Sequence, residues 1–301
     1  MKTFALRFLI GIFVATALSL TAWAQTKPGL IKAVKVQGEV YKLTKDGQSA
    51  KLAEGGLLTE SDTVTTGKAS SVVLVFMNGA SVKVAQESKL AVEEFLMDPL
   101  DTPINVSQLT KEPSISKTKL NLAYGEVVGE VKHLNREAGS TFNIETPVGA
   151  AGIRGTTFRI VFRPTGDGKA FKFTLSTAEG IVLFTGTSQG GAGVDVPKDK
   201  EVVVTADIDP VTGKVSSLEV SDVQNISPAA FQVITDSVNS AIVQAQQTTN
   251  FTPEEQHNPP TTPGNANPES GGTNNTNKGD NVTPDNSKTN NPQLTPGDGK
   301  S

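Results

Sequence analysis

The sequence predicts an all-β protein, a roll-like or solenoid-like sandwich of short strands with one C-terminal helix and a disordered tail. Three observations support this fold class. Residues 25–225 contain short apolar runs that glycine and proline interrupt, as expected for sandwiches and rolls. The tripeptide Gly-x-Val occurs at Gly38, Gly125 and Gly180. One segment alone, residues 226–247, has the apolar spacing of an amphipathic helix.

The first 24 residues are organised like a secretory signal peptide. Lys2 and Arg7 accompany an apolar run from Phe8 to Leu20, and a small-x-small triplet ends at Ala24. The run is shorter than the roughly 20 residues that a membrane span needs, which disfavours a retained anchor. We therefore expect cleavage after Ala24, a periplasmic or secreted mature protein, and no membrane span after cleavage.

The charge and the cysteine content of the chain argue against several classes of protein. The chain has no cysteine, so it has neither a disulfide framework nor the cysteine that a bacterial lipoprotein anchor needs. Without residues 1–24 it keeps 25 basic and 31 acidic residues, a net charge of about −6. This mildly acidic chain lacks the basic cluster expected of a nucleic-acid-binding protein.

The β domain is predicted to span residues 25–225. Its clearest element is the stretch SSVVLVFMNGASVKV, in which Asn78-Gly79 predicts a tight hairpin. The unbroken apolar run from Val72 to Phe76 predicts a strand that is covered on both faces. In each Gly-x-Val unit we expect the glycine to begin or kink a strand. Residues 97–118 are polar, contain three prolines, and predict a long excursion from the β core.

Residues 226–247 are predicted to form a helix that docks on the sheet, with partner binding as the alternative. Ser227 is the expected N-cap and Pro228 the first helical residue. The apolar stripe consists of Phe231, Ile234, Val238, Ile242 and Val243. Residues 248–301 are rich in Asn, Pro, Thr and Gly, bury little apolar surface, and are expected to be a disordered tail.

The sequence contains few of the residue patterns that catalysis or metal binding requires. The chain has two histidines, His133 and His257, and no G-x-S-x-G nucleophile elbow, so a Ser-His-acid triad is disfavoured. One histidine without cysteine is a weak basis for zinc. Asp207 and Asp209 lie near a turn that lacks the other oxygen ligands of a calcium loop. We expect no metal and no cofactor.

Carboxylate pairs leave one enzymatic alternative open. Glu93 with Glu94, or Glu126 with Glu130, supply the residue types of a glycoside hydrolase. Sequence spacing does not show that either pair faces one cleft. Exposed carboxylates on strands are the simpler interpretation.

The stretch ETPVGAAGIRGTTFRI, residues 145–160, is the most distinctive of the chain. A strand rather than a helix follows its glycines, which disfavours a phosphate-binding loop. Phe142, Ile144, Phe158 and Ile160 have even numbers, so extended geometry would direct Arg154 to the same interior. We expect a structural arginine bonded to backbone carbonyls or a nearby acid; a bulge at Gly152 or Gly155 would instead turn it outward as an anion-binding arginine.

This stretch resembles the hallmark of the FecR-domain family, in which Thr-Pro-x-Gly is followed by Val-Arg-Gly-Thr-x-Phe. The matching residues are Thr146, Pro147, Gly149, Arg154, Gly155, Thr156 and Phe158, with Ile153 in place of valine. Gly152 lies between the two halves of the motif, and we expect these motif residues to be structural rather than ligand-binding. Weaker similarity extends over about residues 33–206. The resemblance implies an all-β envelope domain, which in iron-transport regulators senses an outer-membrane transporter and signals to a sigma factor. For this chain we instead expect a cleavable signal and no cytoplasmic anti-sigma segment, so direct control of a sigma factor is not expected.

These observations together predict an exported, non-enzymatic module of the cell envelope. Its expected partner is an envelope protein or glycan, and a role in cell-surface signalling follows from the resemblance alone. The alternatives are a carbohydrate-active hydrolase that uses paired carboxylates, and a purely architectural domain.

Overall fold

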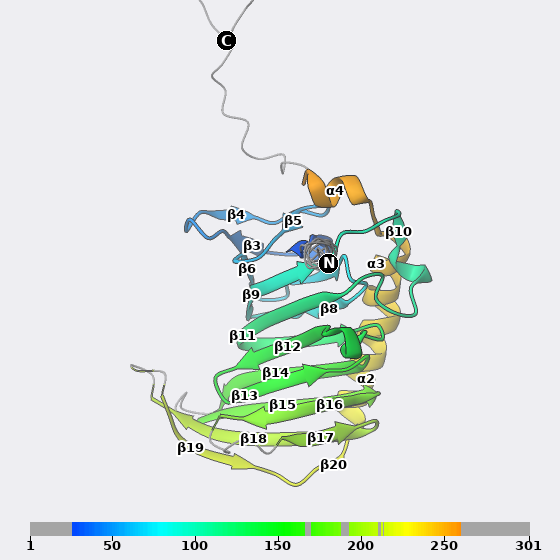
Figure 1. Cartoon of the computed structure of the whole chain (residues 1–301). Helices are drawn as coiled ribbons and strands as arrows, with labels where there is room; N and C mark the ends of the chain where they lie inside the picture. The colour runs from blue at the N-terminus through cyan, green and yellow to red at the C-terminus, as the bar shows by residue number, and fades with distance from the viewer. Residues whose placement is uncertain (1–25, 166–169, 188–192, 210–211, 213, 260–301) are drawn as a thin grey trace, which may run out of the picture. The chain divides into compact units, whose positions relative to one another are not determined.

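In a computed structural model of the chain, the structure describes residues 26–165, 170–187, 193–209, 212 and 214–259. The predicted signal peptide, residues 1–24, lies outside the described residues, as does most of the predicted tail. The described part is built almost entirely of strands, which confirms the predicted all-β class. The strands form two long sheets, here named A and B. In both sheets the strands follow one another along the same direction, from β4 and β5 at one end to β17 and β19 at the other (Figure 1).

Each sheet is a ladder in which the strands follow the order of the sequence, apart from the first two. In sheet A the neighbours run β4, β3, β6, β9, β11, β12, β13, β16 and β17, and in sheet B they run β5, β2, β7, β8, β11, β14, β15, β18 and β19. Two short strands, β1 and β20, pair with β9 and β18. The strands of sheet A are β1 Lys27–Pro28, β3 Val40–Leu43, β4 Ser49–Lys51, β6 Thr63–Thr66, β9 Ser88–Met97, β12 Thr141–Thr146, β13 Gly149–Ile153, β16 Ile181–Gly186 and β17 Val194–Pro197. Those of sheet B are β2 Ile31–Gln37, β5 Leu57–Leu58, β7 Ser71–Phe76, β8 Ser81–Val84, β14 Thr157–Thr165, β15 Ala170–Glu179, β18 Lys200–Ile208, β19 Val215–Val220 and β20 Gln224–Asn225.

One long strand, β11 (Ser116–Glu130), belongs to both sheets. Residues 116–124 pair with β9 and β12 in sheet A, and residues 125–130 pair with β8 and β14 in sheet B. Among the described strands, pairing is antiparallel except between β11 and β12. Because β11 joins the sheets, the hydrogen-bonded strands form one connected network.

The three Gly-x-Val glycines mark points where the chain passes between sheets. Gly38 lies between β2 and β3, Gly125 inside β11, and Gly180 between β15 and β16, with φ values of +73°, +112° and +80°. A Cβ on Gly125 would lie 2.5 Å from the Cα of Ser88, so the neighbouring backbone leaves no room for a side chain. The expectation that these glycines begin or kink strands is confirmed.

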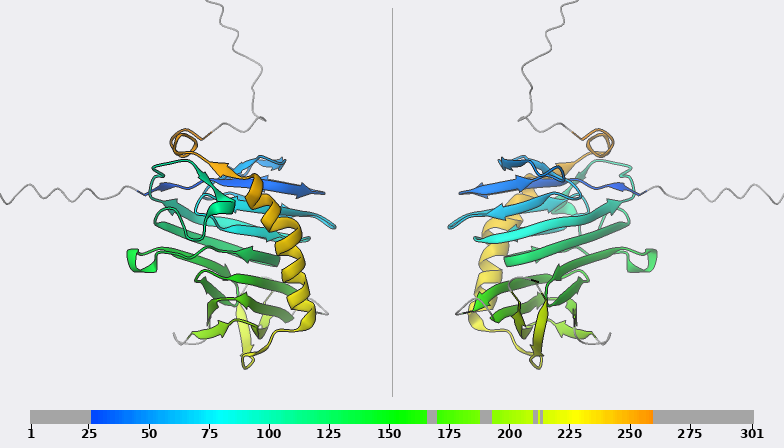
Figure 2. Two further views of the ribbon diagram at one scale, coloured as in Figure 1. Left: turned by 90° about the vertical axis from the view of Figure 1, so that its right-hand side faces the viewer. Right: turned by 90° about the vertical axis from the view of Figure 1, so that its left-hand side faces the viewer.

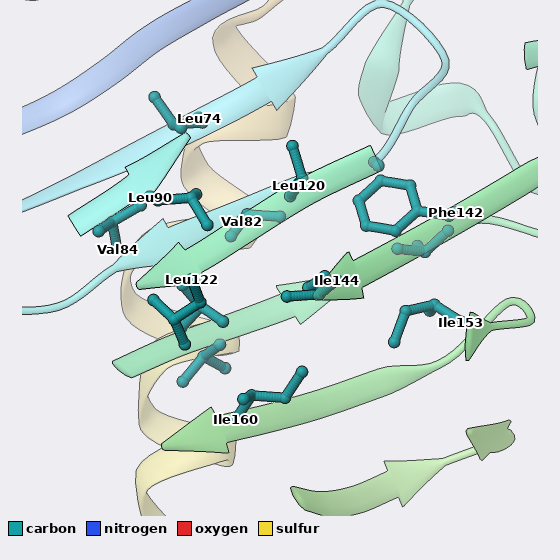
Figure 3. Close-up of a cluster of buried hydrophobic side chains, with 14 of the residues drawn as sticks. Leu74, Val82, Val84, Leu90, Leu120, Leu122, Phe142, Ile144, Ile153 and Ile160 are labelled. Atoms are coloured by element: carbon teal, nitrogen blue, oxygen red, sulfur yellow. The ribbon is translucent and has the colours of Figure 1, made fainter. Parts of the chain in front are cut away.

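The core lies between the two sheets. Figure 3 shows side chains of both sheets pointing toward one another, among them Leu74 and Val84 of sheet B and Leu120 and Ile144 of sheet A. Aromatic rings extend the contact, since Phe76 of β7 packs edge-on against Phe95 and Phe142 of sheet A. Alternation along each strand therefore sends every second residue into this interior.

A helix covers the outer side of sheet B. It runs from Pro228 to Thr248 as α2 (Pro228–Ser237), one π-helical turn η3 (Val238–Ile242) and α3 (Val243–Thr248), and it contacts β7, β8, β11, β14 and β15. Figure 2 shows it in front of the strands in one view and behind them in the other. The predicted docking on the sheet and the predicted Ser227 N-cap, whose hydroxyl accepts from Ala230 N, are confirmed.

Helix docking accounts for the apolar run of β7. All residues from Val72 to Phe76 are buried, because Leu74 and Phe76 point into the core while the alternate residues Val73 and Val75 lie on the helix side. The prediction of a strand covered on both faces is confirmed. The β7–β8 hairpin is confirmed as well, although only Gly79 of the Asn-Gly pair has positive φ.

The predicted apolar stripe is only partly right. Ile234 and Ile242 are buried against the sheet, but Phe231 is 44% exposed. The buried positions instead include Ala230 and Ser237, which recur with Ile234 at spacings of four and three. Phe231 lies about 100° round the helix from Ala230, so it faces away from the sheet.

The ordered chain continues past the predicted boundary at residue 248. Strand β21 (Asn250–Phe251) pairs with β10 (Ile104–Asn105) in the excursion between β9 and β11, and α4 (Pro253–His257) follows. Phe251 is fully buried, and Lys32 of β2 donates to Asn250 O and to Glu255 Oε1, each at 2.7 Å. We name residues 250–256 the C-terminal clasp. The expectation of disorder from residue 248 is therefore wrong for residues 248–259.

Candidate interaction surface

The Arg-Gly-Thr motif forms a corner between the two sheets. β13 ends at Ile153 in sheet A and β14 begins at Thr157 in sheet B. Gly155, between them, has φ +77°, and a Cβ on it would lie 2.6 Å from Nδ1 of His133. At the next crossing, a Cβ on Gly180 would lie 2.6 Å from the carbonyl oxygen of Gly155. These two glycines allow successive crossings to stack directly on one another.

The first half of the motif is a two-residue hairpin turn. Thr146 pairs with Gly149 across Pro147 and Val148, and the Thr146 hydroxyl donates to Gly149 O at 2.8 Å. Pro147 is exposed at the tip, while Val148 is buried.

This turn decides the direction of Arg154. Residues directly opposed in an antiparallel pair share a face, and here Ile144 opposes Ala151. The buried set therefore changes from even numbers in β12 to odd numbers in β13, and Gly152 and Arg154 lie on the outer side. Arg154 is partly exposed, lines a shallow pocket with Arg136 and Asn143, and forms no hydrogen bond or ion pair with any described residue. The structure thus differs from the expected interior position.

The last motif residues point into the core. Phe158 is fully buried and lies against Gly129, where a Cβ would come within 2.5 Å of its ring. Thr156 is 2% exposed, and among described residues its hydroxyl has no hydrogen-bond partner. Thr177 lies on β15 opposite Phe158, and its buried hydroxyl also has no hydrogen-bond partner among the described residues.

A cleft of about 470 Å³ lies beside this corner, and its lining includes Lys111, Glu112, His133 and Asn135. Glu112 is buried, and its carboxylate accepts from Ser116 Oγ at 2.8 Å and from Asn135 N at 2.6 Å. It therefore holds the loop together. A smaller cleft adjoins it at Gly155, where Lys132 is paired with Glu130 at 2.6 Å.

The carboxylates that a hydrolase would use are engaged elsewhere. Glu126 accepts from Arg159 Nε at 2.7 Å, and Glu130 is paired with Lys132. Glu126 and Glu130 are four positions apart on an extended strand, about 13 Å, which is more than the roughly 5–9.5 Å of glycosidase pairs.

A β-bulge opposite Lys119 and Leu120 leaves both Glu93 and Glu94 outside the core. Glu93 shares Lys119 with Glu145, at 3.0 and 3.1 Å. These hydrogen bonds raise the pKa of Lys119 above the ordinary lysine value, and the bond to Glu93 has the larger effect.

No described residues form a group of three or more histidine or acidic side chains placed to hold a metal ion. Asp207 and Asp209 shape a turn: Asp207 Oδ2 accepts from Ser217 Oγ at 2.7 Å and Asp209 Oδ1 accepts from Thr212 N at 2.9 Å. Across the described part of the chain, none of the helices has the length and apolar character of a membrane span.

The outer face of sheet A is open. The described helices α2, η3 and α3 pack on strands of sheet B, whereas the outward residues of sheet A are partly or fully exposed. Six large hydrophobic side chains are exposed among the described residues, and four of them belong to this face. These four are Tyr41 and Leu43 of β3, Tyr124 of β11 and Ile181 of β16.

The family model described as FecR protein matches residues 62–183. The predicted resemblance to the FecR-domain family is therefore confirmed over residues 62–183. The match runs from the loop before β6 to β16, so it includes the long strand β11 and both glycine corners at Gly155 and Gly180. No curated protein matches the sequence.

Two crystal structures of a candidate anti-sigma factor from Parabacteroides distasonis are distantly similar to this chain. They share 11% and 12% identity with this chain, at TM-scores of 0.38 and 0.37. The similarity covers 58% and 57% of this chain, and 63% and 62% of the two solved chains, less than two thirds of each. Likeness at this level carries no argument about function.

Proposed function

We propose that this protein is an exported, non-enzymatic interaction module of the cell envelope that binds an envelope protein or glycan on the outer face of sheet A. The observation that carries the proposal is that Tyr41, Leu43, Tyr124 and Ile181 are all exposed on the sheet face that the helix leaves open. Exposed aromatic and aliphatic groups within a polar surface are characteristic of binding sites.

Two further features support the proposal. The N-terminal segment has the organisation of a signal peptide, which agrees with a periplasmic or secreted location. The FecR domain agrees with an interaction role in the envelope. Its two sheets share β11, so the open face is a rigid platform rather than a loop.

The test is retention of envelope components on the immobilised chain from Gln25 onward. Substitution of Leu43→Ser with Ile181→Ser should abolish the retention of one defined protein or glycan, identified by mass spectrometry and sugar analysis. The matched control is Phe231→Ser with Val233→Ser, which removes similarly exposed side chains from α2. Equal retention by both double variants would contradict the assignment to sheet A.

Turnover provides a second test. Incubation of envelope glycan with the same chain should release no products. Glycan cleavage that a single substitution of Glu126 or Glu93 abolishes would instead establish the hydrolase.

A further inference from the structure

The strand registers of sheet A align five side chains in one row on its open face. Lys51 of β4 opposes Tyr41 of β3, Tyr41 opposes Thr65 of β6, Thr65 opposes Lys89 of β9, and Lys89 opposes Tyr124 of β11. Opposed residues share a face, so all five side chains project on the same side. Lysine and tyrosine thus alternate across five adjacent strands, with one threonine between them. We name these residues the Lys-Tyr row.

The side chains of the Lys-Tyr row are available for a ligand. Tyr41 and Tyr124 are 39% and 43% exposed, and both lysines are exposed. None of the five makes a side-chain hydrogen bond or an ion pair with another described residue. In contrast, Lys119 on the same face is held by two carboxylates.

The dimensions of the row suit an extended chain that lies across the strands. Neighbouring strands are about 4.8 Å apart, so the row is about 19 Å long, the length of a short oligosaccharide. The two tyrosines are three strands apart, about 14 Å, and so are the two lysines. A ligand that crosses the strands would meet aromatic and cationic groups in turn.

The chemistry of the row favours a sugar chain that carries negative charge. The electron-rich face of a tyrosine ring attracts the C–H groups on the apolar side of a pyranose ring. The two unpaired ammonium groups complement carboxylates or other anions on such a chain. Glu39 and Glu87 lie at the sheet corner beyond the row, and Glu93 and Glu145 lie on its other side. These flanking carboxylates would repel negative charge on either side of the row, so an anionic chain is favoured only along the row itself.

We propose that the Lys-Tyr row binds an anionic polysaccharide, with its sugar rings stacked on Tyr41 and Tyr124 and its acidic groups held by Lys51 and Lys89. This inference rests on the proposed function and names the ligand class for the same face.

Titration calorimetry with tetragalacturonate tests the proposal on the chain from Gln25 onward. Tyr124→Ser should weaken binding and raise Kd about tenfold, the equivalent of about 1.4 kcal/mol. Lys89→Gln should raise Kd several-fold and make the affinity less dependent on salt, because one charge contact is lost. The neutral maltotetraose should bind more weakly than the acidic probe.

The controls are Lys172→Gln and Val233→Ser, which remove an exposed charge on β15 and an exposed apolar group on α2. Both should leave Kd unchanged, and melting curves should show that every variant folds. The proposal is overturned if the probe does not bind saturably, if Lys172→Gln weakens binding as much as Lys89→Gln, or if a single-stranded oligonucleotide binds more tightly. Persistence of envelope retention in these cases would leave the proposed function intact.

Discussion

Substitution of Gly180→Ala should destabilise the protein because two crossings between the sheets stack at this glycine. Gly180 has φ +80°, and an alanine Cβ would lie 2.6 Å from Gly155 O and 2.6 Å from Thr156 Cγ2. The left-handed backbone costs an alanine roughly 1–2 kcal/mol. Overpacking against fixed atoms adds about 1–3 kcal/mol. The free energy of unfolding should therefore fall by about 2–5 kcal/mol.

Gly55 supplies a matched control. Its φ is also +80°, but a Cβ there would have no atom within 4 Å. Gly55→Ala should therefore show the backbone cost alone, roughly 1–2 kcal/mol. Urea denaturation gives both values. In thermal melts the further loss in Gly180→Ala should be about 2–4 °C in Tm per kcal/mol.

Equal losses in the two variants would refute the close approach of the crossings. A double variant refines the test, because Thr156→Ser removes the methyl group that meets the new Cβ but leaves the carbonyl of Gly155 in place. Thr156→Ser should consequently recover only part of the loss in Gly180→Ala.

Four further predictions concern other parts of the molecule. Phe251→Ala should lower the free energy of unfolding by about 3–5 kcal/mol, because the ring is fully buried in the C-terminal clasp; a loss below 1 kcal/mol in urea denaturation would contradict its ordered packing. Thr156→Val should be neutral or stabilise by up to about 1 kcal/mol, since it replaces a buried hydroxyl that has no partner, and a clear loss in the same assay would reveal one. Arg154→Ala should change stability by no more than about 0.5 kcal/mol, whereas a marked drop in Tm would restore the structural role. The pKa of Lys119, followed by NMR titration, should lie above the ordinary lysine value and fall back when its two carboxylate partners are neutralised; the stabilisation by these pairs is present at neutral pH and is lost as the pH rises through the raised pKa.

Local patterns in the sequence predict much of this fold. Gly38, Gly125 and Gly180 are recognisable because only glycine enters the left-handed corners between the sheets without strain. The run from Val72 to Phe76 reveals a strand with two covered faces, and Ser227 marks the start of the helix. These features depend on neighbouring residues alone.

The features that depend on pairing could not be predicted in the same way. The outward position of Arg154 follows from the two-residue turn between Thr146 and Gly149, which exchanges odd and even faces. The Lys-Tyr row requires four strand registers at once. The clasp did leave a signal, because Thr252 and Glu255 have capping-box spacing and do form that cap, but the polar composition around Phe251 concealed it.

The C-terminal clasp also affects the time at which the domain can close. Lys32 and Asn250 are 218 positions apart in the chain, so their contact cannot form until almost the whole domain has been synthesised. Contacts of such long range are costly to close and slow to form. Strand β2 therefore completes its contacts only after residues 250–256 have been synthesised. These late residues contact a part of the sheet that was synthesised early.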